Sequence, residues 1–305
     1  MSRRWNMKGM LTPSDWVYRQ ADYHEWPQVV ECWNGYQIGT HENENIVEQF
    51  SRPTSAFTAW GAWRDHQLDT ALLLSPCMPC VHAWPIRSVL ADWPQCLHVA
   101  TQLWAKVAVH FGEMGFSFLQ SLIRTEIIRD IEMMKHVGML ELTSIQQYEN
   151  MLERLTLGSG KIALQQSSES EYPDFRRILL STFVDTLDVP ELNALAGEAS
   201  TGWEYKSDNL RRYLIFNEGV CCGVAVLEVF GEDASLRYIG VKREYRGRGL
   251  AQEALLQVLQ LARHLNCKRV QVRVDARNTP ALRLYQAVGF TKLDEEVLLY
   301  HPLTS

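Results

Sequence analysis

Hydrophobic and polar positions in the second half of the chain follow two periods. Residues 172–183 and 250–265 carry apolar side chains three and four positions apart, which predicts amphipathic helices. Residues 187–209 are polar, with Pro190, Gly197 and Gly202, and indicate a short helix followed by a loop. Runs with strand character and turn residues at their ends predict β-strands at 161–166, 211–217, 220–230, 234–241 and 291–300.

The first half of the chain repeats this order of elements. A shift of 151 residues aligns Gly138-Met139 with Gly289-Phe290, and it places the strand-like runs 57–63 and 68–74 on the hairpin of the second half. Near the start, Trp26-Pro27 and Tyr172-Pro173 lie 146 apart, so a short insertion or deletion interrupts the match. We interpret the pattern as an internal duplication, with domains at 1–156 and 157–305.

A glycine-rich segment, Arg246–Ala251, joins the strand that ends at Val241 to the helix that starts at Leu250. Glycines at such a junction let backbone N–H groups approach an anion, and the helix adds the positive end of its dipole. The segment is neither a P-loop nor a dinucleotide fingerprint, because Gly-Lys-Ser/Thr and the Gly-x-Gly-x-x-Gly spacing are both absent. Taken alone it is equally consistent with a tight turn before a basic helix start.

Two ordered motifs give this segment a context. Tyr238–Ala251 resembles motif A of the GNAT family of N-acetyltransferases, whose pattern is Arg/Gln-x-x-Gly-x-Gly/Ala after a hydrophobic strand. Val270–Phe290 resembles motif B of that family, in the order strand, Asn278, short helix, Tyr285 and Gly-Phe. Asn278 is also a good helix N-cap, and Pro280 suits a first helical turn. Two motifs about 30 residues apart are more specific than either alone.

The resemblance implies an α+β fold with two tandem GNAT domains, each a mixed, mainly antiparallel twisted sheet flanked by helices. It implies acetyl-CoA as co-substrate, with the backbone of Ile239, Gly240 and Val241 pairing with the pantetheine arm like an added strand. The N–H groups of the pyrophosphate loop are those of Arg246, Gly247, Arg248, Gly249, Leu250 and Ala251. Either Arg243 or Arg248 meets the nucleotide phosphates, and Asn278 either bonds the pantetheine region or caps its helix.

Direct transfer to an amine in this family needs a proton donor and a proton acceptor. Tyr285 is the candidate general acid, since a phenol holds its proton until thiolate develops, although a packed aromatic is the alternative. The chain has Ser235 where many family members place a strand-four glutamate. Glu228 is therefore the first candidate base, with Glu232, Asp233 or a water chain behind it.

The first half departs from the family pattern where chemistry is expected. The segment aligned with Arg246–Ala251 is Gln95–Ala100, in which His98 stands at the position of Gly249. At the same shift, Met134 replaces Tyr285 and Ile127 replaces Asn278. A side chain at the glycine position obstructs a pyrophosphate. We therefore expect a degenerate, non-catalytic first domain.

The composition of the chain argues against several classes of function. The chain has 305 residues, a net charge of −6 and seven cysteines, so a large nucleic-acid footprint and a disulfide framework are not expected. No apolar run reaches membrane-spanning length and no signal h-region follows the basic start, so we expect a cytoplasmic protein without membrane partners. Cys77, Cys80 and His82, with Cys96 and His98, have the chemistry of zinc ligands, but strand geometry argues against a site, and no metal is expected.

These patterns favour an acetyl-CoA-dependent N-acetyltransferase (an acyltransferase of groups other than amino-acyl groups) that acts on a primary amine. The alternative is a non-catalytic acyl-CoA-binding sensor or scaffold. The sequence leaves open whether the acceptor is polyamine-like, an amino sugar, an amino acid or a peptide N-terminus. Asp185, Asp188 and Glu191 could attract such an amine, or could be a solvated polar loop. A monomer is plausible, because the degenerate half could replace a partner subunit.

Overall fold

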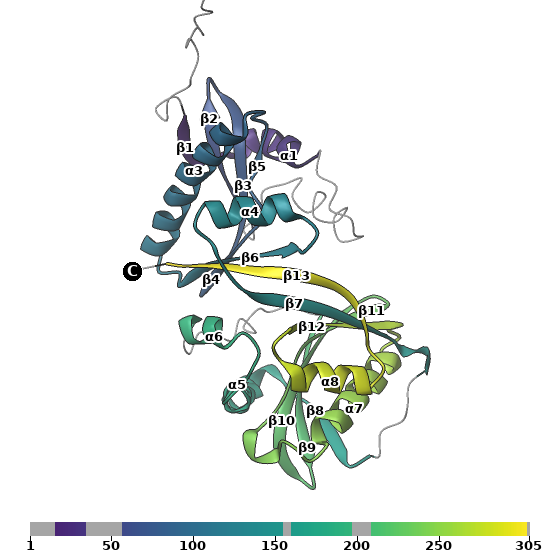
Figure 1. The fold of residues 1–305 in the computed structure, drawn as a ribbon. Helices are drawn as coiled ribbons and strands as arrows, with labels where there is room; N and C mark the ends of the chain where they lie inside the picture. The colour runs from purple at the N-terminus through teal and green to yellow at the C-terminus, as the bar shows by residue number, and fades with distance from the viewer. Residues whose placement is uncertain (1–15, 35–56, 155–159, 197–208, 304–305) are drawn as a thin grey trace, which may run out of the picture. The chain divides into compact units, whose positions relative to one another are not determined.

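The computed structural model describes residues 16–34, 57–154, 160–196 and 209–303, and they form two compact units. Unit 1 contains the described residues up to Leu142 and the segment from Val297, and unit 2 runs from Thr143 to Glu296. Their helices and strands are drawn in Figure 1. None of the described helices has the length and apolar character needed to cross a bilayer.

Unit 2 is built on a mixed sheet in the order β7-β12-β11-β10-β9-β8. The pairs β8–β9, β9–β10, β10–β11 and β12–β7 are antiparallel, whereas β11 and β12 are parallel. The strands are β7 (Leu140–Met151), β8 (Ile162–Gln166), β9 (Leu210–Asn217), β10 (Val220–Phe230), β11 (Asp233–Val241), β12 (Arg269–Asp275) and β13 (Thr291–Pro302). The predicted strands of this half are confirmed to within one or two residues at each end.

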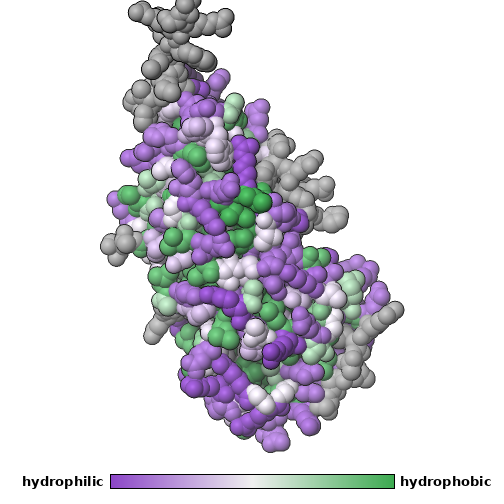
Figure 2. All heavy atoms as spheres, in the orientation of Figure 1, coloured by the Kyte–Doolittle hydropathy of each residue, from purple (hydrophilic) through white to green (hydrophobic). Residues whose placement is uncertain are grey.

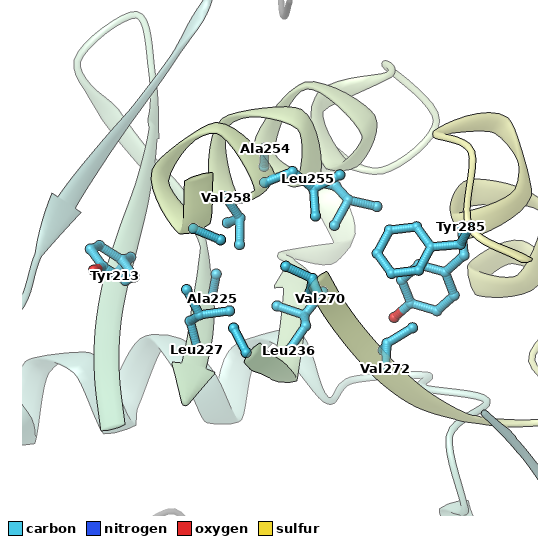
Figure 3. Close-up of a cluster of buried hydrophobic side chains, with 14 of the residues drawn as sticks. Tyr213, Ala225, Leu227, Leu236, Ala254, Leu255, Val258, Val270, Val272 and Tyr285 are labelled. Carbon is cyan, nitrogen blue, oxygen red and sulfur yellow. The ribbon is translucent and has the colours of Figure 1, made fainter. Parts of the chain in front are cut away.

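Helices cover both faces of this sheet. The helices are α5 (Tyr172–Thr182), α6 (Pro190–Ala196), α7 (Leu250–His264) and α8 (Thr279–Ala287). Figure 3 shows α7 laying Ala254, Leu255 and Val258 over strand residues that include Leu227 and Val270, with Tyr285 at the side of the cluster. The opposite face packs against α5 through Phe175 and Leu179. Burying both faces explains the nearly continuous apolar run of β10.

Unit 1 repeats this layering. Its elements are β1 (Val17–Gln20), α1 (Trp26–Asn34), β2 (Thr58–Arg64), β3 (Gln67–Cys77), β4 (Cys80–Ala83), β5 (Arg87–Ser88), α3 (Trp93–Glu113), β6 (Phe118–Arg124) and α4 (Ile128–His136). The strand order is β1-β2-β3-β4-β6-β13, with β5 paired to β3. α3 and α4 pack on one face around Leu103 and Trp104, and α1 packs on the other around Trp26.

The two units also share capping and turn conformations, and this supports the internal duplication. Asp22 and Glu25 form a capping box ahead of α1, and Ser168 and Glu171 form one ahead of α5. The first hairpin turn has positive φ at Asp65 and His66 in unit 1 and at Glu218 and Gly219 in unit 2. Gly138 and Gly289 follow α4 and α8 with φ of 107° and 91°, the conformation typical after a helix C-terminus.

The units do not divide at residues 156 and 157. Residues Thr143–Met151 of β7 belong to unit 2, where the strand pairs with β12 from Ile145 to Met151. The end of β13 from Val297 belongs to unit 1, where Leu299 is completely buried among α3 and α4 residues. The last strand of each half thus completes the sheet of the other repeat. Sequence periodicity finds strands but not their partners, so the predicted domain ranges do not express this exchange.

Exposed apolar side chains are spread over several elements. On the face drawn in Figure 2, hydrophobic residues are interrupted by hydrophilic ones. Val220 and Phe230 at the two ends of β10, and Val109 on α3, are more than half exposed. Single apolar residues of this kind are ordinary on protein surfaces and do not mark a binding site.

Candidate active site

The site is formed where β11 and β12 separate. The parallel pairing of the two strands ends at Leu236 and Val272, although β11 continues to Val241 and β12 to Asp275. A bulge lies at the same place, because Val226 pairs with Tyr238 and the next residue, Leu227, pairs with Leu236. Bulges bend a strand and increase its twist. The backbone edge of β11 beyond Leu236 is therefore left facing an opening instead of a neighbouring strand.

Two glycines permit this geometry. A Cβ on Gly240 would lie 2.5 Å from the hydroxyl oxygen of Tyr238, so a larger residue there would displace the tyrosine ring. A Cβ on Gly223 in β10 would lie 2.3 Å from the Gly240 carbonyl oxygen. Tyr238 stacks on Phe183 at 4.9 Å, and its hydroxyl lies 2.8 Å from Thr182 Oγ1. Burial raises the pKa of Tyr238 to about 12.

The glycine-rich segment has the conformation expected of an anion loop. Gly247 and Gly249 both have φ of 75°, a region that other residues enter at a cost. Gly249 is the N-cap of α7 and supplies no side chain to bond the first N–H groups of the helix. Those groups have no partner within the helix itself. They remain available to a ligand, and the helix dipole favours an anionic one.

Three arginines in or near this segment make different contacts. The Arg246 guanidinium donates to the carbonyl oxygens of Thr182 at 2.9 Å, Val184 at 2.8 Å and Val241 at 3.2 Å, so it ties the end of α5 to the loop. Arg243 pairs with Asp185 at 2.8 Å on the surface. Arg248 is exposed and lies 5.6 Å from the Tyr245 ring centre.

A cavity of about 520 Å³ occupies the opening between the strands and reaches the glycine-rich segment. The predicted site residues that line it are Ile239, Gly240, Val241, Arg246, Gly247, Gly249, Leu250, Ala251, Asn278 and Tyr285. Arg248 and Glu228 are not among the lining residues. One cavity therefore collects residues from both sequence motifs.

Tyr285 and Asn278 are two residues of motif B that line this cavity. Tyr285 is 6% exposed and its ring lies 5.5 Å from that of Phe290. Burial, reinforced by the negative charge of Asp188, raises the pKa of the Tyr285 hydroxyl. Asn278 Oδ1 accepts the Ala281 N–H at 3.3 Å, which makes it the N-cap of α8.

The proposed base Glu228 lies elsewhere. It sits on β10 opposite Ser235, and its carboxylate is 3.7 Å from the Arg237 guanidinium. Glu232 pairs with Lys268 at 2.7 Å, and Asp233 pairs with Arg269 at 2.7 Å. The structure thus engages these three carboxylates in ion pairs outside the cavity lining. Sequence spacing placed them near the correct strand but not on its open edge.

An ionic network that sequence reasoning missed joins the end of β12 to α6. Asp275, completely buried at the end of β12, accepts hydrogen bonds from Arg277, from Thr143 Oγ1 at 2.8 Å and from the Val189 N–H at 3.2 Å. Burial alone would raise the pKa of Asp275, but these donors outweigh it and lower the pKa. Arg277 also holds Glu191 in a two-bond pair at 2.7 and 2.9 Å. An aspartate that directly ends a strand was the signal available in the sequence.

The start of the corresponding helix in unit 1 is closed by a side chain. α3 begins at Trp93 with Asp92 as its N-cap, so His98, which the alignment sets opposite Gly249, lies inside the helix. Asp92 Oδ2 accepts the Gln95 N–H at 3.0 Å, and Pro94 offers no N–H. A carboxylate thus sits where unit 2 leaves the helix start open, and Ile127 caps α4 with no side-chain bond.

All seven cysteines are free thiols. Cys77 and Cys80 face each other in the β3–β4 hairpin, whereas Cys96 is buried in α3. The expectation that strand geometry would prevent a zinc site assumed a longer strand after Cys80, but β4 has four residues. Within the described ranges, the side chains close enough to share an ion are Asp22, His24 and Glu25, and Glu25 is already bonded by Arg19.

The comparisons with known proteins agree with this geometry. The acetyltransferase (GNAT) family model matches residues 172–290. N-alpha-acetyltransferase MAK3 of Arabidopsis thaliana is 31% identical over 93 residues, which are 29% of this chain and 47% of that protein. Mycothiol acetyltransferase of Pseudarthrobacter chlorophenolicus is 37% identical over 65 residues, 21% of this chain and 20% of that protein. The matched parts thus span about half of these curated relatives or less.

Solved structures extend the likeness to both units. A GCN5-related N-acetyltransferase from Sphaerobacter thermophilus aligns with a TM-score of 0.63 and 15% identity, covering 97% of this chain and 98% of that one. A tandem GNAT protein from the clavulanic acid biosynthesis pathway aligns with a TM-score of 0.58 and 14% identity, covering 95% and 99%. At these identities the likeness concerns the fold: this chain has the tandem GNAT fold, and its residues 172–290 match the GNAT acetyltransferase family model.

Proposed function

We propose that unit 2 binds acetyl-CoA and transfers its acetyl group to a primary amine. The observation that carries this proposal is the open edge of β11 leading directly to the uncapped start of α7. Ile239, Gly240 and Val241 would hold the pantetheine arm, and the backbone from Arg246 to Ala251 would hold the pyrophosphate. The exposed side chain of Arg248, within this loop, would meet the nucleotide phosphates.

Bound acetyl-CoA would supply an activated acyl group that an amine can attack directly. The chain must then move two protons, one away from the attacking nitrogen and one toward the departing sulfur. Tyr285 is suited to the second task, since its raised pKa keeps the hydroxyl protonated until a stronger base than water develops beside it. The Arg246 side chain acts through structure, because it fixes the end of α5 against the loop.

Unit 1 would not perform this chemistry. Asp92 occupies the start of α3, and Met134 stands on α4 where Tyr285 stands on α8. A carboxylate at that helix start would repel a pyrophosphate and already takes one of its N–H donors.

The acceptor is proposed only as a class. Names among the relatives include an N-alpha-acetyltransferase and a putative ribosomal-protein alanine N-acetyltransferase from Bacillus subtilis; the first refers to an α-amino group and the second to an alanine of a protein. We therefore rank peptide N-termini first, ahead of amino acids, amino sugars and polyamines.

Two measurements test the proposal. Titration calorimetry of the full chain with acetyl-CoA should show one site, and no binding would refute it. Thiol release should then be followed across alanine-initiated peptides, free amino acids, glucosamine and spermidine. Release with at least one amine supports the enzyme, whereas binding without release from any of them favours an acyl-CoA sensor.

A further inference from the structure

Asp188 is a carboxylate inside the cavity that the proton transfers described above do not use. It lies in the segment between α5 and α6 and lines the cavity together with Tyr238 and Tyr285. Its negative charge adds to the effect of burial in raising the pKa of both tyrosine hydroxyls. Asp188 thus faces the atoms around which an acetyl group would be transferred.

The backbone and its neighbours hold this side chain in place. Asp188 Oδ1 accepts the Asp275 N–H at 3.1 Å, at the end of β12. The Asp188 N–H donates to Thr186 Oγ1 at 3.2 Å, and its carbonyl accepts Asn193 Nδ2 at 2.8 Å. The next residue, Val189, is fixed through its N–H to Asp275. The backbone that carries Asp188 is thus fixed, and the bond from Asp275 orients its carboxylate, so the residue is already positioned for a ligand.

The ionic network of Asp275, Arg277 and Glu191 also helps to hold Asp188 in place. Arg277 bonds Asp275 on β12 and Glu191 on α6, so the segment that carries Asp188 is tied to the strand across the cavity. Its guanidinium is consumed by these two carboxylates. It therefore orients Asp188 without neutralising it.

The cations around the cavity are committed to other groups. Arg246 bonds backbone carbonyls, Arg243 pairs with Asp185, and Arg273 on β12 lies 3.2 Å from Glu296. Arg237 on β11 faces Glu228 at 3.7 Å, and Arg283 of α8 is exposed at the rim. In the part of the chain that the structure describes, none of these arginines forms an ion pair with Asp188. A negative charge that faces a cavity without its own cation is a site for a cationic ligand.

We propose that Asp188 receives the ammonium group of the acceptor and removes the proton that must leave before the amine can attack. This deepens the proposed function and rests on it. Asp188 takes one proton from the ammonium, which frees the nitrogen lone pair to form a bond with the acetyl carbonyl carbon. As the carbon–sulfur bond breaks and its electron pair passes to sulfur, Tyr285 gives that sulfur a proton.

The remaining protons then balance. The second proton that leaves the nitrogen returns to the Tyr285 oxygen, and Asp188 releases its proton to solvent after the amide and the thiol depart. Burial, with the negative charge of Asp275, raises the pKa of Asp188 despite the hydrogen bonds from the Asp275 N–H and the Asn278 side chain. Its carboxylate therefore takes a proton more readily than an exposed aspartate. Glu228, outside the cavity, has no comparable access to the reacting atoms.

A pair of coenzyme A thioethers tests the ammonium site without knowledge of the acceptor. S-(2-aminoethyl)-coenzyme A carries an ammonium just beyond the sulfur, and S-ethyl-coenzyme A is its uncharged counterpart. The full-length wild type should bind the cationic compound roughly tenfold more tightly, because a charged hydrogen bond is gained. Asp188→Asn should abolish this preference while it binds S-ethyl-coenzyme A normally. Asp174→Asn, an exposed ion-pair residue of α5, is the matched control and should retain it.

Each outcome decides a separate point. If the wild type binds neither thioether, the proposed function fails. If it binds both equally, or if Asp188→Asn keeps the preference, only the role of Asp188 fails. With an amine that supports thiol release, kcat/KM of the wild type should fall on the acid side as Asp188 is protonated. In Asp188→Asn this fall of kcat/KM on the acid side should disappear. If it disappears in Glu228→Gln instead, the base is Glu228.

Discussion

Two tyrosines face the same cavity, and their surroundings assign them different tasks. The Tyr238 hydroxyl is engaged by Thr182 Oγ1 at 2.8 Å. In the described ranges no hydrogen bond holds the hydroxyl of Tyr285. A phenol without a protein partner can give its proton to a group that arrives, whereas an engaged one is held in place. The two pKa values are both raised, so geometry distinguishes the donor from the structural residue.

Tyr285→Phe removes the proposed proton donor and leaves the ring. We expect turnover to fall about 100-fold, the usual contribution of general acid catalysis, with less than a twofold change in the Kd for acetyl-CoA. Thiol release and calorimetry measure the two effects. Tyr213→Phe, in the same core cluster but away from the cavity, is the control and should keep normal turnover. Unchanged turnover in Tyr285→Phe would reject the assignment.

Gly249→Ala places a Cβ at the start of α7 with φ of 75°. No atom lies within 4 Å of that Cβ, so the stability cost is backbone strain of about 1 kcal/mol. Affinity for acetyl-CoA should fall at least tenfold, because the Cβ and the strained backbone disturb the anion loop. Gly219→Ala has φ of 77° and equally open surroundings in a hairpin turn. It should lower Tm similarly and leave affinity unchanged; equal affinity losses in both variants would argue against an anion loop.

At the scale of elements, the same device starts the first helix of each repeat. A capping box precedes α1 and α5, and a proline occupies the first turn of each helix. The version in unit 1 carries an additional ion pair. Arg19 bonds both oxygens of Glu25 at 2.6 and 2.7 Å, and Glu25 is 9% exposed.

This pair makes the stability of unit 1 depend on pH. The hydrogen bonds from Arg19 lower the pKa of Glu25 from 4.5 to about 2. A lowered carboxylate pKa stabilises the fold above pH 4.5, and that stabilisation is lost as pH falls toward 2. Glu25→Gln should therefore destabilise unit 1 by about 1 to 3 kcal/mol at pH 7, the range for a charged hydrogen bond.

Calorimetric Tm measured from pH 7 to pH 2 checks this prediction. The difference between wild type and Glu25→Gln should shrink between pH 4.5 and 2. Glu171→Gln changes the corresponding residue of unit 2, which is bonded by Ser168 instead of by an arginine, and should have a smaller effect. A difference for Glu25→Gln that stays constant over the whole range would exclude the ionic origin.

At the scale of the whole molecule, the repeats exchange their last strands. Leu299 of β13 is buried among residues of α3 and α4, although it follows unit 2 in the sequence. Tyr148 and Leu152, which belong to the first half of the sequence, lie in the core of unit 2 that Tyr285 also joins. The proposed domains at 1–156 and 157–305 would each lack one of these strands, so we expect neither half to fold when produced alone.

Leu299→Ala tests the exchange in the intact chain. The cavity left in unit 1 should cost about 2 to 5 kcal/mol, while the Kd for acetyl-CoA at unit 2 should change less than twofold. Leu293→Ala lies on the same strand but is half exposed and should cost under about 0.5 kcal/mol. Thermal unfolding and calorimetry measure both effects. A mild effect of Leu299→Ala would show that unit 1 does not depend on this strand.

Local features were the part of the fold and site that the sequence could predict. The glycine loop, the Asn278 cap and the strands of unit 2 each depend on a few neighbouring residues, and the structure places them as expected. The strand exchange was not predictable, because β7 and β13 have the same pattern whichever sheet they join. Asp188 depends on Asp275 and Arg277, more than 80 positions away, and only the folded chain brings them together.

The exchange also sets an order of completion during synthesis. The residues from Val297 that finish the sheet of unit 1 leave the ribosome after all of unit 2. At 5 to 20 residues per second, synthesis of the 154 residues from 143 to 296 takes roughly 8 to 30 s. During this time β6 lacks its neighbour β13. An unpaired strand edge invites pairing with other chains. The unit that comes first in the sequence is therefore the last to be completed, and a nascent chain stalled within unit 2 would expose it to aggregation.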